Sequence, residues 1–378
     1  MPVKEKHKEI HLDAPNVGEL EKEYLARAID SGFVSTIGPF VSQFEGIFAR
    51  YLGTSKTVST QSGTAALHMA LYELGIGPGD EVIVPALTFA ATANAVLYVG
   101  ARPVIVDVDP KTWTIDCEDV QRNLSAKTKA IIPVHLYGTP CAMNELSKIA
   151  REKDIYLIED ATESLGATYN GQPMGTFGEM GCFSFNGNKV ITTGGGGIIA
   201  GKNAPRLEHI KYLINQAKDS LSAGAAGFHK EMGFNYRMTN IEAAVGIAQM
   251  ERLPGFLIKK LLFAGIYREE LADVKEIAFQ GSYAPAKSSF WLNAVTLNGE
   301  INLSLLQQGM KERGIATNRI FMPLTEFPFL NDSARRDCPR AKELYAKALC
   351  LPSSTLNSEE DIRYVCRILK EELRKNIS

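Results

Sequence analysis

A lysine and an aspartate stand out as side chains that could carry chemistry together. Lys189 lies in the polar, glycine-rich run 184–197, and Asp160 follows the apolar run 155–159, twenty-nine residues before the lysine. An amine can form an imine with an aldehyde, and a carboxylate can keep a pyridine nitrogen protonated so that its ring accepts electrons. The pair therefore suggests pyridoxal phosphate. Taken singly, a solvated surface lysine and a turn-forming aspartate are the ordinary interpretations.

Two further segments could bind the phosphate of such a cofactor. Residues 60–71 pass from a strand end into an apolar helical pattern through Gly63 and Thr64, and free amides at a helix start favour anions. A plain Ser/Thr helix cap is the alternative there. Ser184 stands five residues before Lys189. Its hydroxyl and the lysine amine could therefore address opposite ends of one cofactor.

Short β-branched runs alternate with helical patterns between residues 52 and 201. The expected strands are 57–60, 81–84, 102–106, 130–134 and 156–159. This alternation predicts a mostly parallel sheet covered on both faces, with ligands beyond the carboxyl ends of its strands. Phe89, His135, Tyr137 and Asp160 each follow such a run. Phe89 could stack on a flat ring, although a core phenylalanine is the commoner situation.

Composition limits the possible functions. The chain is 45% hydrophobic and 22% charged, with a net charge of −2, as in an ordinary globular protein, and its 378 residues are enough for two domains. The signs are interspersed, so we expect no nucleic-acid partner. No apolar stretch reaches the roughly twenty residues of a membrane span, and the start is charged, so we expect a cytoplasmic protein without a membrane segment. The six cysteines and six histidines lack ligand spacing, so we expect no metal site.

Several ordered motifs carry a family resemblance. Residues 159–167 read Glu-Asp-Ala-Thr-Glu-Ser-Leu-Gly-Ala, 184–189 read Ser-Phe-Asn-Gly-Asn-Lys, and 60–66 read Thr-Gln-Ser-Gly-Thr-Ala-Ala. With the segments 30–45 and 233–240, they resemble the sugar aminotransferases of the DegT/DnrJ/EryC1/StrS family. The likeness extends over nearly the whole chain.

The resemblance implies an α/β fold of the aspartate-aminotransferase-like type, the pyridoxal phosphate-dependent transferase fold type I. It implies a large cofactor domain with a mostly parallel sheet over residues 1–255, including the N-terminal segment, and a smaller α+β domain over residues 256–378. Such enzymes work as homodimers with an active site shared between subunits.

Residue roles follow from the resemblance in the same way. Lys189 would form the imine with the cofactor and later move the proton, Asp160 would pair with the pyridine nitrogen, and Phe89 would stack on the ring. The phosphate would be held by Gly63, Thr64, Ser184 and, from the neighbouring subunit, Asn235.

Glu163 stands where many relatives have glutamine or histidine, near the 3-hydroxyl of the cofactor. With a glutamate at this position and the sequence of residues 184–189, the chain resembles enzymes that aminate UDP-4-keto-6-deoxy sugars. The implied reaction moves nitrogen from L-glutamate through pyridoxamine phosphate to a keto group of a nucleotide-linked sugar, at C4. His135, Tyr137 and Arg319 are the candidates for substrate contacts.

Other functions stay open on the sequence alone. The acceptor could be a C3-keto sugar or a keto-cyclitol, and the carrier could be UDP, GDP or dTDP. A related dehydratase would have histidine in place of Lys189, which argues against that chemistry. A non-catalytic regulator of the same fold is the remaining alternative, although the complete set of Asp160, Ser184 and Lys189 weighs against it.

Overall fold

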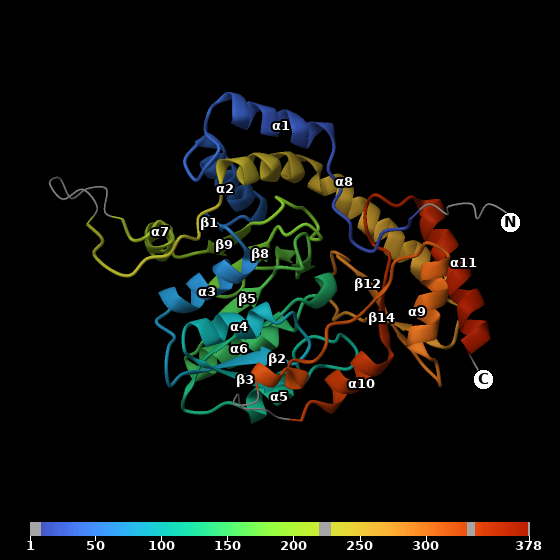
Figure 1. Ribbon diagram of the computed structural model, residues 1–378. Coiled ribbons are helices and arrows are strands. Elements are labelled where there is room, and N and C mark those ends of the chain that lie inside the picture. Colours follow the sequence, from blue (N-terminus) through green and yellow to red (C-terminus); the bar gives the residue numbers. More distant parts are fainter. Residues whose placement is uncertain (1–8, 219–227, 331–336, 377–378) are drawn as a thin grey trace.

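A seven-stranded sheet forms the centre of the larger part of the protein (Figure 1). The computed structural model describes residues 9–218, 228–330 and 337–376. The strand order is β1-β9-β8-β5-β4-β2-β3, and β9 alone runs against the others. The strands are β1 Lys56–Thr60, β2 Glu81–Pro85, β3 Arg102–Val106, β4 Thr128–Ile131, β5 Tyr156–Asp160, β8 Met180–Ser184 and β9 Gly197–Gly201. The mostly parallel α/β sheet expected from the sequence is confirmed.

Both faces of this sheet are covered by helices. Alternate residues of a strand point to opposite sides, so one strand contributes to two cores. Val82 and Val84 of β2 belong to one apolar core and Ile83 to another. The first core packs against α2 Pro39–Leu52, α3 Gly63–Glu73, α4 Ala91–Tyr98 and α7 Ala204–Leu213, the second against α5 Cys117–Arg122 and α6 Met143–Lys153. Because all the strands but β9 run in the same direction, their carboxyl ends lie at one edge of the sheet.

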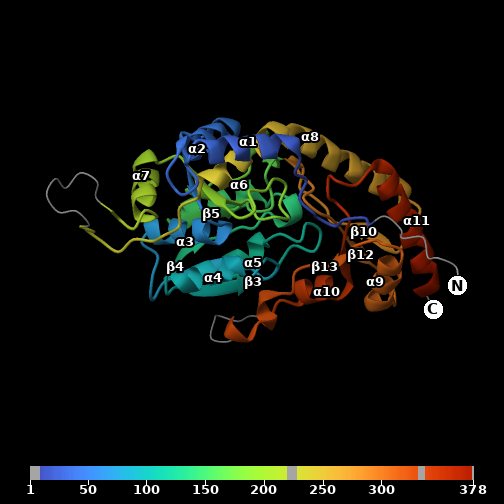
Figure 2. The same cartoon turned by 45° about the horizontal axis from the view of Figure 1, so that its top comes forward.

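Helix α8, Asn240–Glu270, connects the two parts of the molecule. In Figure 2 it runs from above the large sheet to the C-terminal helices. It begins with a capping box of Thr239 and Glu242 and continues through Pro254. Its first half is buried in the core of the large sheet and its second half in a separate core. The expected boundary at residue 255 lies inside this one helix, and the division into residues 1–255 and 256–378 stays a proposal.

The C-terminal part is built on a four-stranded antiparallel sheet of order β10-β12-β14-β13. Its elements are β10 Ile277–Phe279, β12 Asn293–Leu297, α9 Leu303–Glu312, β13 Asn318–Arg319, the short turns η2 Leu324–Glu326 and η3 Pro328–Leu330, α10 Pro339–Lys347, β14 Ala348–Leu351 and α11 Glu359–Asn376. A small third sheet has the order β11-β6-β7, and its strands are β6 Thr168–Tyr169, β7 Gln172–Pro173 and β11 Ala286–Lys287. The N-terminal segment also packs here, since the Ile10 N–H donates to the Gly314 carbonyl over 2.9 Å and the Ile10 side chain lies in this core. Helix α1, Glu19–Asp30, lies instead along α8.

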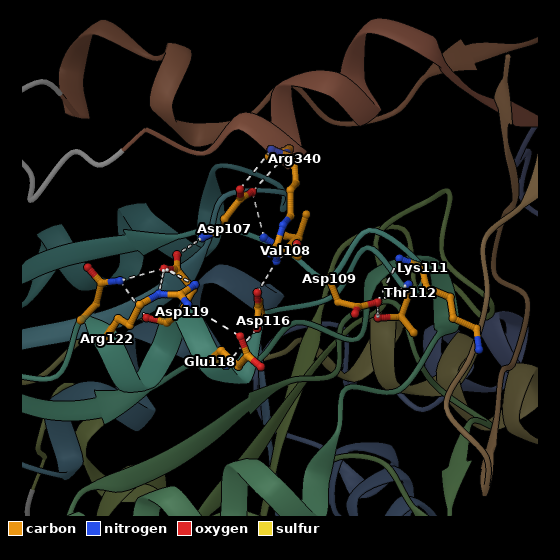
Figure 3. Close-up of polar contacts among 12 residues, drawn as sticks. Asp107, Val108, Asp109, Lys111, Thr112, Asp116, Glu118, Asp119, Arg122 and Arg340 are labelled. Carbon is orange, nitrogen blue, oxygen red and sulfur yellow. Dashed lines mark hydrogen bonds and ion pairs between the residues drawn. The ribbon is translucent and has the colours of Figure 1, made fainter.

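An aspartate joins the C-terminal part to the large sheet (Figure 3). The Asp107 carboxylate, just after β3, accepts the N–H groups of Arg340 and Ala341 in the first turn of α10, each over 3.0 Å. Arg340 also pairs with Asp116. Nearby, the Leu324 N–H donates to the Ala86 carbonyl over 2.8 Å. This last contact brings the segment around residues 320–326 to the carboxyl end of β2.

No helix in the described ranges combines the length and the apolar character that crossing a membrane requires.

Candidate active site

A cavity of about 270 Å³ lies at the carboxyl ends of β1, β2, β5 and β8. Its lining brings together six of the residues expected from the sequence, which are Gly63, Thr64, Phe89, Asp160, Ser184 and Lys189. The rim predicted by the strand pattern therefore exists as one pocket. Trp291 and Phe321, from the C-terminal part, complete its wall.

Lys189 lines this cavity. It lies in the loop between β8 and β9, and its side chain is 13% exposed. Its Nζ is 3.6 Å from Oε1 of Glu163 and 3.9 Å from the centre of the Trp291 ring. Lys189 is therefore not a solvated surface lysine, and its amine is available to a ligand in the pocket.

Asp160 ends β5, is 3% exposed and lines the same cavity. Its Oδ2 accepts a hydrogen bond from the Thr92 hydroxyl over 2.8 Å, and its Oδ1 accepts from the hydroxyl and the N–H of Thr162 over 2.7 and 3.2 Å. Three donors fix the carboxyl group in one orientation. Asp160 thus has the burial and the rigid placement that a partner for a pyridine nitrogen requires.

The start of α3 can receive an anion. Ser62 is the helix cap, and its hydroxyl accepts the Ala65 N–H over 3.1 Å. The amides of Gly63 and Thr64, ahead of Ala65, have no acceptor within the helix, and the helix dipole favours negative charge there. A Cβ added to Gly63 would lie 2.8 Å from the Cβ of Ser184. The cap and the anion site expected as alternatives are therefore compatible, and the missing side chain leaves room beside the serine hydroxyl.

Phe89 is 60% exposed at the mouth of the cavity, so it is not a core residue. Its ring centre lies 5.9 Å from that of Phe321. An apolar ring with a free face at a pocket mouth suits stacking on a flat ligand.

Glu163 stands behind the lysine rather than on the pocket lining. Its side chain is 1% exposed, and its Oε2 accepts the Tyr137 N–H over 2.9 Å. Burial raises the pKa of Glu163 to about 7, against the opposing effect of the nearby Lys189 ammonium. A pKa of about 7 places the titration of this carboxyl group near neutral pH, beside the Lys189 amine.

His135 and Tyr137 lie beneath the site. His135 is fully buried, accepts the Cys141 N–H at Nδ1 over 3.2 Å, and has its Nε2 3.2 Å from Oε2 of Glu159. The Tyr137 hydroxyl, also buried, accepts the Phe321 N–H over 2.9 Å. Neither side chain lines the cavity. The structure thus places these two substrate candidates in the supporting layer.

Arg319 and Asn235 also lie outside the cavity lining. Arg319 donates to the Tyr345 carbonyl, and its guanidinium carbon lies 4.3 Å from the centre of the Tyr345 ring. Asn235 is exposed and forms a β-bridge with Asn215.

The sequence analysis did not single out several of the lining residues, among them Thr92, Thr162, Trp291 and Phe321. Thr92 and Thr162 orient Asp160, and the signal for Thr162 was its position two residues after the aspartate, where a side chain often bonds back. Trp291 and Phe321 come from distant segments of the C-terminal part, and no local pattern marks them.

The arrangement fits pyridoxal phosphate. An amine, a rigid carboxyl group, an anion site at a helix start and an exposed aromatic face line one cavity, and the glycine at position 63 leaves the space that a phosphate group needs.

Comparison with known proteins agrees. Residues 15–370 match the DegT/DnrJ/EryC1/StrS aminotransferase family. The chain is 37% identical to a GDP-perosamine synthase of Caulobacter vibrioides, covering 96% of this chain and 98% of that one. It is 30% identical to a dTDP-4-dehydro-2,3,6-trideoxy-D-glucose 4-aminotransferase of Saccharopolyspora spinosa, covering 98% of each.

Among solved structures, the putative sugar aminotransferase Spr1654 of Streptococcus pneumoniae in its PLP form superposes with a TM-score of 0.91. Its sequence identity is 28%, covering 98% of this chain and 100% of that one. The fold agrees with this likeness. The chain belongs to the DegT/DnrJ/EryC1/StrS family and is a pyridoxal phosphate-dependent aminotransferase.

Proposed function

We propose that this enzyme transfers an amino group from L-glutamate to the C4 keto group of a nucleotide-linked keto-deoxy sugar. The observation that carries the proposal is that Lys189, whose side chain is mostly buried, lines the same cavity as Asp160 and an anion site. Family membership and the names of the relatives, which include a GDP-sugar enzyme and a dTDP-sugar 4-aminotransferase, support the acceptor class. A nucleoside diphosphate carrier is common to both names.

Each pocket residue has a role in this reaction. Bound pyridoxal phosphate supplies an electron-accepting ring that lets a carbon next to the amine lose its proton. Lys189 would hold the cofactor through its amine and would carry the proton at Nζ. Asp160 would pair with the pyridine nitrogen, and Phe89 would cover the ring. Ser184 and the amides of Gly63 and Thr64 would hold the phosphate.

Glu163 is placed to regulate the lysine in the same site. Its carboxyl group faces Nζ from the side of the buried turn at residue 137. We assign Glu163 as the polar residue that would lie near the 3-hydroxyl of the cofactor. Its carboxyl group can take up or return a proton near neutral pH.

We further propose a homodimer in which the partner subunit's Asn235 completes the phosphate site. Within one chain, Asn235 is exposed and lies away from the cavity lining. An exposed asparagine is free to reach a neighbouring subunit. His135, Tyr137 and Arg319 are better placed to support the walls, since each of these side chains has a polar contact with another protein group.

The function is tested by following the two half-reactions separately. The purified holoenzyme is first converted with L-glutamate to its pyridoxamine form, and keto sugars on UDP, GDP and dTDP are then offered one at a time. We expect a 4-keto-6-deoxy sugar nucleotide to restore the original cofactor absorbance and Lys189→Ala to give neither change. Restoration only by 3-keto sugars or by a free keto-cyclitol would contradict the proposed acceptor. Absence of any glutamate reaction would favour the regulator alternative.

A further inference from the structure

We propose that Trp291 is a positioning residue for Lys189, which the C-terminal part of the chain delivers to the active site. The proposal rests on the role given to Lys189 in the proposed function and extends it to a second side chain. Two contacts of one indole ring together fix where the lysine amine stands.

The first contact is with the amine itself. Nζ of Lys189 lies 3.9 Å from the centre of the Trp291 ring, and the tryptophan is 2% exposed. The face of an indole ring carries negative charge density, which attracts an ammonium group most strongly where water is excluded. The ring therefore attracts the charged amine to this position.

The second contact is with the backbone that carries the lysine. The indole Nε1–H donates to the carbonyl of Asn188 over 2.7 Å, immediately before Lys189. In the same loop, the Lys189 N–H donates to the Asn186 carbonyl over 3.0 Å. One tryptophan thus limits both the loop and the many rotamers of a long lysine side chain.

Trp291 is itself firmly held. The N–H groups of Ser289 and Leu292, on either side of it, donate to the carbonyls of Gly138 and Tyr137 over 3.1 and 3.4 Å. The two backbone segments approach so closely that a Cβ on Gly138 would lie 3.0 Å from the backbone nitrogen of Trp291. The Nζ of the buried Lys260 of α8 donates to the Trp291 carbonyl over 3.0 Å. The ring therefore has a fixed support independent of the lysine.

The same turn also holds the group on the other side of the amine. The Tyr137 N–H donates to Glu163, while the Tyr137 carbonyl receives the Leu292 N–H. Glu163 and Trp291 are thus tied to one short segment and both contact Nζ. This arrangement gives the amine a defined position between a carboxyl group and a ring.

Loss of the ring should affect the chemical step more than binding. An amine that moves among several positions spends less time near the carbon whose proton it carries, whereas the rest of the pocket is unchanged. We therefore expect kcat to fall about 10- to 100-fold in Trp291→Leu, with KM within about threefold of the wild type.

The experiment compares holoenzymes of the wild type, Trp291→Leu and Trp291→Phe. The cofactor absorbance that reports its bond to Lys189 is titrated with pH, and single-turnover rates with L-glutamate are recorded. Because the ring favours a charged nitrogen, the pH midpoint should be lower by about half a unit in Trp291→Leu. Trp291→Phe keeps a ring but loses the N–H, so its midpoint should stay near the wild-type value while its rate falls only in part.

Trp113 provides a matched control. It is also 2% exposed but does not line the cavity, so Trp113→Phe should leave both the midpoint and the rate unchanged. Circular dichroism and the melting temperature verify that each variant is folded. A folded Trp291→Leu enzyme with wild-type midpoint and rate would overturn the proposal for Trp291 alone. A wild-type enzyme without the lysine-linked absorbance would instead overturn the role of Lys189, and with it the positioning role of Trp291.

Discussion

At the residue scale, Asp160 owes its fixed orientation to three hydrogen bonds, two from Thr162 and one from Thr92. Asp160→Asn keeps the shape but removes the charge that pairs with a protonated ring nitrogen. We expect kcat/KM to fall about 10³-fold, the size typical of losing a preorganised electrostatic contact. Steady-state assays with L-glutamate measure it.

Thr92→Val provides the comparison for that variant. It removes one of the three donors and leaves the carboxyl group in place, so we expect a loss of about tenfold or less. An Asp160→Asn enzyme no slower than Thr92→Val would show that the carboxyl charge has no special role.

Glu163 makes a prediction about pH. Its folded-state pKa is about 7, above the ordinary value of 4.5, chiefly because burial disfavours the charged carboxylate, with a further rise from Asp160. A raised pKa in the folded state gives stability that is present below the unfolded pKa and is lost as the pH rises through the folded pKa. The wild type should therefore lose stability relative to Glu163→Gln between about pH 4.5 and pH 7, by at most about 3 kcal/mol.

Urea unfolding of the two cofactor-free proteins across that pH range measures the difference. A constant difference between them at all pH values would contradict the assigned titration. A difference of opposite sign would mean that the Lys189 ammonium outweighs burial.

At the element scale, Asp107 links α10 to the large sheet through the N–H groups of Arg340 and Ala341. Asp107→Ala removes the acceptor for both amides and should destabilise the protein by about 2 kcal/mol, since one buried and one partly buried donor lose their partner. Hydrogen exchange at these two amides should become faster.

Asp109→Ala is the matched control, because the Asp109 carboxylate accepts hydrogen bonds only within its own turn, from Lys111 and Thr112, among the contacts of the described residues. Its substitution should leave exchange at Arg340 and Ala341 unchanged. Equal exchange in both variants would show that α10 is held by other contacts.

The sequence was most informative about the elements of the large sheet. The five strands expected between residues 57 and 159 all appear, with ends shifted by at most a few residues, because β-branched runs bounded by turns are local signals. The continuity of α8 through Pro254 could not be read locally, since proline usually interrupts a helix and here tertiary burial outweighs that tendency.

In the site too, residues close to local sequence signals were predicted and residues placed by distant packing were not. Lys189, Asp160 and Ser184 lie near strand ends and could be placed on one rim from the strand pattern. Trp291 and Phe321 reach the cavity only through the packing of the C-terminal part, which depends on contacts over more than a hundred residues. His135 follows a strand run as the others do, yet its side chain points into the interior beside Glu159. Sequence position alone could not distinguish these two directions.

At the scale of the whole molecule, the proposed dimer makes a complementation test possible. Lys189→Ala and Asn235→Ala should each have little activity alone. If the partner subunit's Asn235 completes each site, a mixed dimer contains one site with both wild-type residues. After mixing equal amounts under conditions that allow subunit exchange, random pairing should restore about a quarter of the wild-type activity.

Activity of the mixture equal to the mean of the two separate variants would contradict a shared site. Mixing each variant with itself provides the control for the exchange conditions. Size-exclusion chromatography with light scattering verifies that the mixture contains dimers.

The covalent bond between Lys189 and pyridoxal phosphate is the central claim, and borohydride reduction followed by peptide mapping tests it most directly. Reduction makes the bond permanent, so mass spectrometry of the digested holoenzyme should find the added cofactor on the peptide that contains Lys189. Pretreatment with L-glutamate, which moves the cofactor off the lysine, should abolish that label. Label on a different lysine, or none on a holoenzyme that contains the cofactor, would contradict the account.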